Sequence, residues 1–221
     1  VMMWALAFAL YVGFKWLSLA DFAEREGNPS PTKAIGFLTL WPGRDADAFF
    51  DTQTKVPRPA LPQWAFALAK IALGCAILFT LVRSAMQIHP LVGGWTAMTG
   101  IAFTLHFGII HLLALIWRSA NVNVTPIMQA PVLSNSVSDF WSRRWNLAFR
   151  DLVHRFVFRP VSGKLGPRYG MWAVFLLSGV MHDLVISLTA RGGYGLPTLY
   201  FLLQGTAMWL ERTRLGKRLG L

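Results

Sequence analysis

The stretch that decides the fold runs from Met171 to Ala190 and reads MWAVFLLSGVMHDLVISLTA. Its length is close to the roughly 20 residues that an α-helix needs to cross the hydrocarbon core of a bilayer. Only His182 and Asp183 interrupt its apolar character. Ionisable side chains at membrane depth are costly and usually face a bundle interior or a wet cavity. The stretch therefore predicts a spanning helix that carries a polar site.

Other parts of the chain repeat this apolar character. The remaining candidate spans, of which the last is short, are Val1–Leu19, Leu61–Val82, Leu91–Trp117 and Leu196–Leu210. The composition is 54% hydrophobic and 14% charged, which is too apolar for an ordinary soluble domain. We therefore predict an all-α, polytopic integral membrane protein with about five spanning helices.

The net charge of +11 raises the question of nucleic acid binding, which the placement of the basic residues answers. If Leu61–Val82 runs outward and Leu91–Trp117 inward, most of them share one side of the membrane. This side carries Arg25, Lys33, Arg44, Lys55, Arg58, the basic residues from Arg118 to Arg168, Arg212, Arg214, Lys217 and Arg218. The opposite loops carry only Arg83 and Arg191. The positive-inside rule makes the basic loops and the C-terminus cytoplasmic, so membrane lipids are expected partners and no nucleic acid is needed.

Several chemistries lack their sequence signatures. The chain shows no Gly-rich phosphate loop, no G-x-S-x-G elbow and no paired metal-ligand spacing, which argues against a serine hydrolase, an NTP-driven machine or a metal site. His106 and His111 lie about 140° apart on a helix, so packing or tunnel lining is expected for both. Lys70 lies near the middle of its span and requires either water or a partner that the sequence does not identify. Cys75, the only cysteine, is expected to pack in the core.

The segment between Arg118 and Gly170 contains an amphipathic pattern. Ser138 and Asp139 are a plausible helix start, and no proline follows until Pro160. On a helical wheel one arc is apolar and carries Trp141, Trp145, Ala148, Phe149, Leu152 and Phe156. The opposite arc is polar and carries Asp139, Arg143, Asn146, Arg150 and His154, widened by Arg144, Asp151 and Arg155. A basic amphipathic helix with indole rings is expected to lie in the plane of the membrane surface on the cytoplasmic side.

Two interpretations of this segment and of His182 remain open. Asn146 is either simply solvated on a lipid-binding helix or, one turn from both Arg143 and Arg150, holds a thioester or phosphate group. His182 is either hydrogen-bonded to a neighbouring helix or acts as a general base in a cavity beside the small residues Ser178 and Gly179. Spacing alone does not separate these alternatives.

Two sequence blocks carry a resemblance to a known family. Residues 136–147 read SVSDFWSRRWNL and residues 175–183 read FLLSGVMHD. Together they resemble the wax synthase-like branch of the membrane-bound O-acyltransferase (MBOAT) family, with a similarity that covers residues 99–214. Ser142 replaces the usual glycine and Asp183 the usual glutamate, so no role that needs the reach of a glutamate is carried over.

The resemblance implies a wax ester synthase-like activity, in which an acyl-CoA-dependent enzyme esterifies a lipid-soluble, long-chain alcohol. His182 would be the catalytic base and Asn146 its partner, with Asn146 on the cytoplasmic side and His182 deeper in the membrane. Acyl-CoA would be a co-substrate, with no tightly bound cofactor and no metal. The implied binding residues for coenzyme A are Arg143, Arg144, Arg150, Trp141 and Trp145.

The acceptor and the extent of the protein stay open at this point. Diacylglycerol, a sterol, a sugar or a secondary-metabolite hydroxyl would suit the same chemistry, and a non-catalytic lipid-binding or transport protein is the alternative from another class. Residues 1–221 are expected to form a single membrane acyltransferase domain in a bacterial inner membrane. Because the chain has fewer spans than full-length relatives, it is expected to be a fragment or a compact bacterial version.

Overall fold

The computed structural model describes residues 2–218, which are mainly helical and contain no strand within that range. The contacts divide them into two compact units. One unit comprises the chain up to Asn28 together with the chain from Gln129 onward, and the other comprises Pro29–Met128. That residues 1–221 act as one domain stays a prediction.

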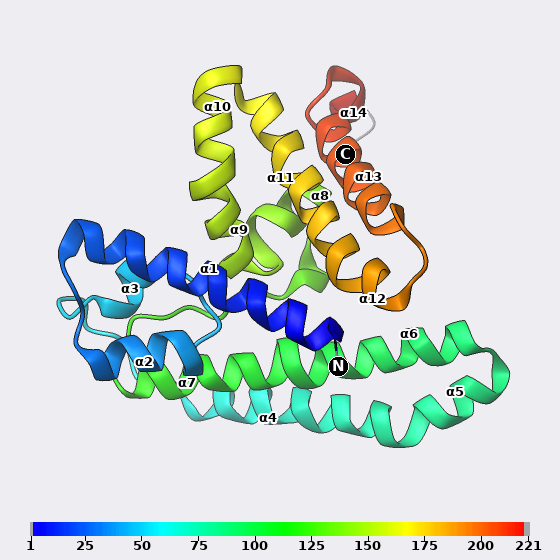
Figure 1. Ribbon diagram of the computed structural model, residues 1–221. Helices are drawn as coiled ribbons and strands as arrows, with labels where there is room; N and C mark the ends of the chain where they lie inside the picture. The colour runs from blue at the N-terminus through cyan, green and yellow to red at the C-terminus, as the bar shows by residue number, and fades with distance from the viewer. Residues whose placement is uncertain (1, 219–221) are drawn as a thin grey trace. The chain divides into compact units, whose positions relative to one another are not determined.

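The unit formed by Pro29–Met128 is built on a long helical hairpin (Figure 1). Its first arm is continuous through α4 (Leu61–Ala76), the π-helical segment η1 (Ile77–Leu81) and α5 (Val82–Ile88). Its second arm is continuous through α6 (Pro90–Ile101), the π-helical segment η2 (Ala102–Ile109) and α7 (Ile110–Ser119). The turn is tight because His89 is extended and its Nδ1 accepts a hydrogen bond from the amide of Leu91 at 3.2 Å.

Small residues let the two arms approach closely. A Cβ on Gly74 would lie 2.3 Å from Thr104 Oγ1, and one on Gly108 would lie 2.4 Å from Ile71 Cγ1. Contacts of this kind are typical of helix pairs in membranes, where packing rather than the hydrophobic effect holds helices together.

The hairpin also supplies the partner of Lys70. Its Nζ lies 2.8 Å from Nδ1 of His111 and 4.5 Å from the centre of the Phe66 ring. The ring of His111 meets that of Phe66 edge-on at 6.5 Å. Lys70 and His111 therefore form one polar pair between α4 and α7.

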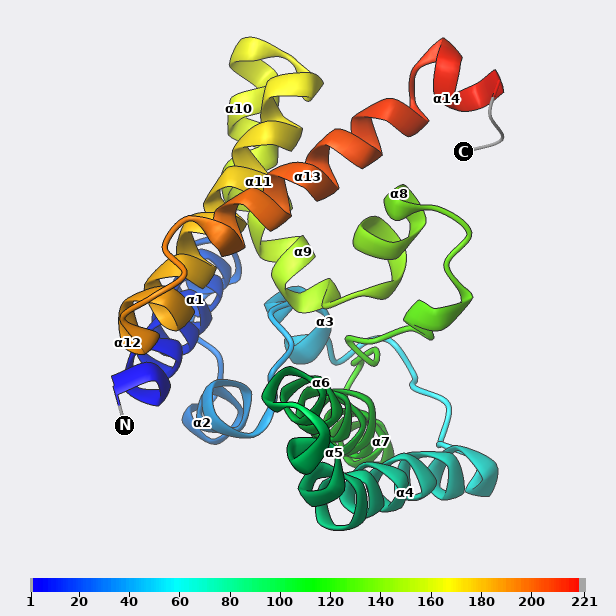
Figure 2. The ribbon, with the colours of Figure 1, turned by 90° about the vertical axis from the view of Figure 1, so that its right-hand side faces the viewer.

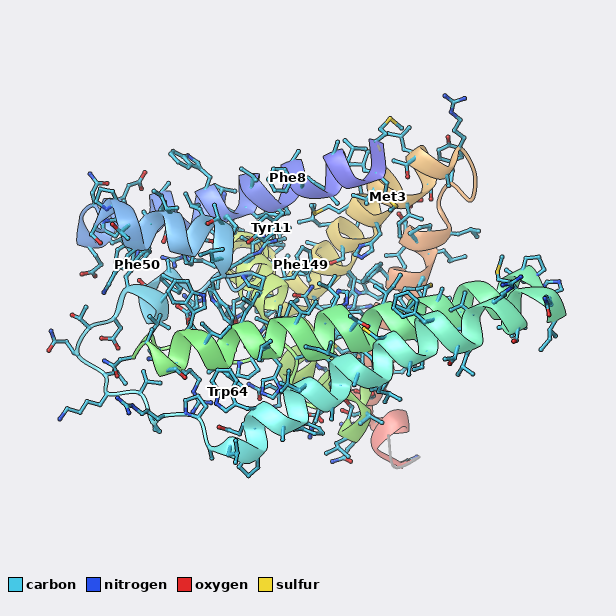
Figure 3. The ribbon with its side chains drawn as sticks, turned by 90° about the horizontal axis from the view of Figure 1, so that it is seen from below. Met3, Phe8, Tyr11, Phe50, Trp64 and Phe149 are labelled. Atoms are coloured by element: carbon cyan, nitrogen blue, oxygen red, sulfur yellow. The ribbon has the colours of Figure 1, made fainter. Side chains whose placement is uncertain are left out.

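Two short helices, α2 (Pro31–Leu40) and α3 (Ala46–Phe50), complete this unit. The prolines between Ala20 and Ala60 prevent a long helix here. An aromatic cluster joins the short helices to α7, with Phe49 4.9 Å from Trp117 and 5.2 Å from Phe37 between ring centres. Figure 3 labels Phe50 in this cluster and Trp64 on α4.

In the other unit, α1 (Met2–Glu26) packs along the connection that precedes α11. Phe14 of α1 meets Phe149 edge-on at 6.4 Å, and Arg155 forms an ion pair with Asp21. Figure 3 shows Tyr11 of α1 close to Phe149. Aromatic packing and an ion pair thus fix α1 against this connection.

The connection and the last helices of this unit follow in order. They are η3 (Pro131–Leu133), α8 (Val137–Asp139), η4 (Phe140–Arg144), α9 (Leu147–Val153), η5 (His154–Phe158), α10 (Arg159–Leu165), α11 (Pro167–His182), η6 (Asp183–Ser187), α12 (Leu188–Ala190), α13 (Leu196–Glu211) and α14 (Arg214–Arg218). α11 packs against both α10 and α13, and Figure 2 shows α13 crossing it. The buried core of this unit lies between α11 and α13 and contains Met171, Phe175, Phe201 and Met208.

Four helices within the described residues are long and apolar enough to span a membrane. They are Ala5–Glu26, Leu61–Ile88, Pro90–Ser119 and Pro167–Ala190. The protein is thus an all-α integral membrane protein, as predicted from the sequence. The fifth predicted span is α13, whose 16 residues cover about 24 Å at 1.5 Å per residue, less than the roughly 30 Å of a hydrocarbon core.

Candidate active site

The predicted amphipathic helix is interrupted at Asn146, so the prediction of one continuous helix is wrong. η4 ends at Arg144, and Asn146 adopts the left-handed conformation with φ 43° and ψ 57°. Asparagine is among the few residues other than glycine that tolerate this conformation. The second helix then continues past Pro160 to Leu165, because a π-helical turn, η5, precedes the proline and accommodates its missing amide donor.

Asn146 also begins the second helix. Its Oδ1 accepts a hydrogen bond from the amide of Phe149 at 3.3 Å, which is the geometry of an N-cap. The side-chain oxygen is therefore engaged with the helix, and the same amide also carries an NH₂ group, which is a hydrogen-bond donor.

Arg144 holds the chain that precedes the break. Its Nε lies 2.5 Å from Asp139 Oδ2, and its Nη1 donates to the carbonyl of Ala130 at 3.3 Å. The carbonyl of Arg144 accepts from the amide of Gln129 at 2.8 Å. The hydrogen bond and positive charge of Arg144 lower the pKa of Asp139, which keeps this pair ionised. The Arg144 side chain thus connects η4 to the Gln129–Pro131 stretch through hydrogen bonds.

The hairpin of η5, α10 and α11 brings Asn146 to the level of His182. The carbonyl oxygen of Phe158 lies 3.0 Å from where a Cβ on Gly170 would stand, so these two residues face each other. Asn146 is 12 residues before Phe158 (158 − 146), and His182 is 12 residues after Gly170 (182 − 170). On two antiparallel helices, residues that are equally far along the chain from a pair of facing residues lie at about the same level. By this count Asn146 and His182 lie at a similar level along the hairpin, and their relative depth in a membrane stays a prediction.

His182 is held in one tautomer. Its Nδ1 lies 2.6 Å from the carbonyl oxygen of Ser178, one turn earlier on α11. A carbonyl can only accept, so Nδ1 carries the proton and Nε2 has the free lone pair. The ring rests on that of Phe201 from α13, with 4.5 Å between ring centres. The imidazole is thus oriented by one hydrogen bond and one ring contact.

Asp183 binds the start of α13 and not the histidine beside it. Its Oδ1 accepts from the amide of Gly195 at 2.9 Å and from Ser187 Oγ at 2.7 Å. Its Oδ2 accepts from the amide of Thr198 at 3.1 Å and from the Thr198 hydroxyl. Gly179 allows this approach, because a Cβ there would lie 2.6 Å from Cα of Thr198. The carboxylate therefore ties α13 to the end of α11.

Asn146 and His182 line the same cavity, which has a volume of about 340 Å³. That volume is at the lower end of the range for small-molecule sites. The aromatic residues of the lining are Trp141, Trp145, Phe149, Phe158, Phe175 and Phe201. The polar groups of the lining are Ser142, Asn146, Arg150, His154, Ser178, His182 and Arg212. An imidazole, a side-chain amide and cations thus share one largely apolar space.

Some of the site residues predicted from sequence line the cavity and others do not. Trp141, Trp145 and Arg150 line the cavity with Asn146 and His182. Trp141 is fixed by a hydrogen bond of 3.2 Å from its Nε1 to Gln204 Oε1.

Arg143 and Arg144 are not among the described residues that line the cavity. Sequence reasoning also missed Phe201, Met208 and Arg212, because their contribution depends on how α13 packs on α11.

Comparisons with known proteins identify a family that this part of the chain resembles. The family model described as the membrane bound O-acyl transferase family matches residues 124–203, which include both Asn146 and His182. A protein named probable long-chain-alcohol O-fatty-acyltransferase 1, from Arabidopsis thaliana, is 30% identical over 171 residues, which is 70% of this chain and 47% of that protein.

Further relatives from the same organism match shorter segments. Probable long-chain-alcohol O-fatty-acyltransferase 2 is 32% identical over 49% of this chain and 36% of its own length. Acyl-CoA--sterol O-acyltransferase 1 is 26% identical over 52% of this chain and 37% of its own length. The chain spans about half the length, or less, of these curated relatives. It belongs to the membrane-bound O-acyl transferase family and is similar to its wax synthase-like members.

Proposed function

We propose that this protein transfers an acyl group from acyl-CoA to the hydroxyl of a lipid-soluble, long-chain alcohol. The observation that carries the proposal is the shared cavity, in which the Nε2 side of His182 is available as a base and Asn146 lines the same space. The names of the relatives, long-chain-alcohol O-fatty-acyltransferases, support this substrate class.

In the proposed mechanism His182 is the general base. Its Nε2 accepts the proton of the alcohol while the alcohol oxygen attacks the thioester carbonyl. The NH₂ group of Asn146 donates a hydrogen bond to the carbonyl oxygen as it gains negative charge. The carbon–sulfur bond then breaks, and the imidazolium returns its proton to the thiolate of coenzyme A. Because the thioester is already activated and both substrates can be held together, no acyl-enzyme is required.

The other predicted residues have distinct roles in this proposal. Arg150, with Trp141 and Trp145 beside it, offers a cation and aromatic surface to coenzyme A. The basic loops and the C-terminus face the cytoplasm, in a bacterial inner membrane, so that acyl-CoA enters from that side. Acyl-CoA is a co-substrate, and the membrane lipids supply the acceptor.

The experiment that tests the function is an acceptor panel with the protein reconstituted in nanodiscs. Labelled palmitoyl-CoA would be offered with hexadecanol, a sterol or diacylglycerol, and the products identified by mass spectrometry. The proposal predicts hexadecyl palmitate as the main ester. A sterol ester as the main product would support the second acceptor class, which the similarity to the sterol acyltransferase favours. Bound acyl-CoA with no ester from any acceptor would refute the enzyme assignment.

A further inference from the structure

The cavity has a cationic end that the family resemblance does not assign. Along α13 the lining passes from Phe201, which touches the His182 ring, through Met208 to Arg212. Arg212 is 11 residues after Phe201 (212 − 201), which corresponds to about 16 Å at 1.5 Å per residue. Arg212 therefore lies about 16 Å along α13 from Phe201, the residue that touches the His182 ring, and both line one cavity.

Arg212 differs from the other arginines near the cavity in its contacts. Arg150 pairs with Asp151 at 3.0 Å, and Arg144 is held by Asp139. Among the described residues, no hydrogen bond or ion pair engages the exposed guanidinium of Arg212. A second cation lies near Arg212, because Arg168 is in the first turn of the facing helix α11 and its guanidinium carbon lies 5.3 Å from the centre of the Trp209 ring. The planar guanidinium of an arginine can donate two parallel hydrogen bonds to the oxygens of a phosphate group.

We propose that Arg212 binds the phosphates of acyl-CoA while the thioester lies at His182, an assignment that rests on the proposed function. In coenzyme A, a pantetheine arm separates the sulfur from the first phosphorus. At about 3.5 Å for every three backbone bonds, as in an extended chain, this arm covers roughly 15 Å. That length matches the separation between Phe201, beside the base, and Arg212. The aromatic and methionine side chains between them then pack against the arm.

A comparison of two acyl donors tests the assignment. Palmitoyl-CoA carries the phosphates, whereas S-palmitoyl-pantetheine keeps the thioester and lacks them. Arg212→Ala should raise KM for palmitoyl-CoA about tenfold or more, as expected for the loss of a charge-assisted contact, with kcat nearly unchanged. The same variant should use S-palmitoyl-pantetheine as well as the wild type does, which also shows that it is folded. For Arg212→Lys, KM for palmitoyl-CoA should lie between the wild-type value and that of Arg212→Ala.

The matched control is Arg214→Ala, which removes an exposed arginine two residues away that does not line the cavity. It should leave KM for both donors unchanged. An equal loss with both donors, or no change in KM for palmitoyl-CoA, would overturn the assignment of Arg212. If the wild-type protein forms ester from neither donor, the proposed function fails and this assignment fails with it.

Discussion

Replacing Gly179 with alanine should separate α13 from α11 beside His182. The new Cβ would lie 2.6 Å from Cα of Thr198, whereas carbon atoms in contact prefer about 3.5–4.0 Å. The backbone of α13 must therefore move by roughly 1 Å, since no flexible side chain can absorb the clash. Overpacking of this kind costs about 1–3 kcal/mol. The shift also displaces Phe201 from the His182 ring, and a misplacement of about 1 Å near a reacting group can lower the rate about 100-fold.

The assay compares thermal unfolding in detergent and ester formation in nanodiscs for two glycine variants. Gly163→Ala is the control, because a Cβ on this helical glycine of α10 would meet no atom within 4 Å. It should be as stable and active as the wild type, or slightly more stable. Gly179→Ala should melt earlier and form ester more slowly. Equal stability and activity of the two variants would refute the close approach of α11 and α13.

Five further substitutions at three places test individual contacts. Asn146→Gly should fold with nearly wild-type stability and form no ester, because glycine accepts the left-handed conformation. Asn146→Ala should lose about 2 kcal/mol in addition, from the cap and the backbone strain; equal melting temperatures of the two variants would contradict the assigned backbone. His111→Leu should destabilise the protein more than Lys70→Met, by up to about 3 kcal/mol, since it leaves an ammonium at membrane depth without its acceptor; thermal unfolding of both variants checks the order. The Asp139–Arg144 pair should stabilise the fold fully above the ordinary carboxyl pKa of 3.8. Because the pKa of Asp139 is lowered in the folded state, this contribution should disappear as the pH falls through that lower value. The difference in melting temperature between wild type and Asp139→Asn should therefore narrow below pH 3.8, and a constant difference would count against the pair.

The spanning helices could be predicted because hydropathy is a local property of the sequence. The stretch Met171–Ala190 and both arms of the hairpin need only their own apolar residues to be recognised. His182 could be selected for a related reason, since an ionisable residue at membrane depth is costly wherever its partners lie. These predictions required no knowledge of tertiary contacts.

The break at Asn146 could not be predicted from periodicity. Asn146 fits a helical wheel as well as a helix cap, and the choice depends on contacts such as that of Gln129 with Arg144. The partner of Lys70 lies 41 residues away, and Arg212 reaches the cavity through the packing of α13 on α11. Each of these features depends on contacts between residues that are far apart in the sequence, so the local sequence is not sufficient to predict them.

The central claim, that His182 is the base of an acyl transfer in this cavity, is tested most directly by one rate measurement. Ester formation from labelled palmitoyl-CoA and hexadecanol would be measured for the wild type, His182→Ala and Val180→Ala in nanodiscs with equal amounts of folded protein. Val180 is an exposed neighbour on α11 that does not line the cavity. We expect wild-type rates for Val180→Ala and no detectable ester for His182→Ala. Undiminished ester formation by His182→Ala would contradict the role of His182 as the base.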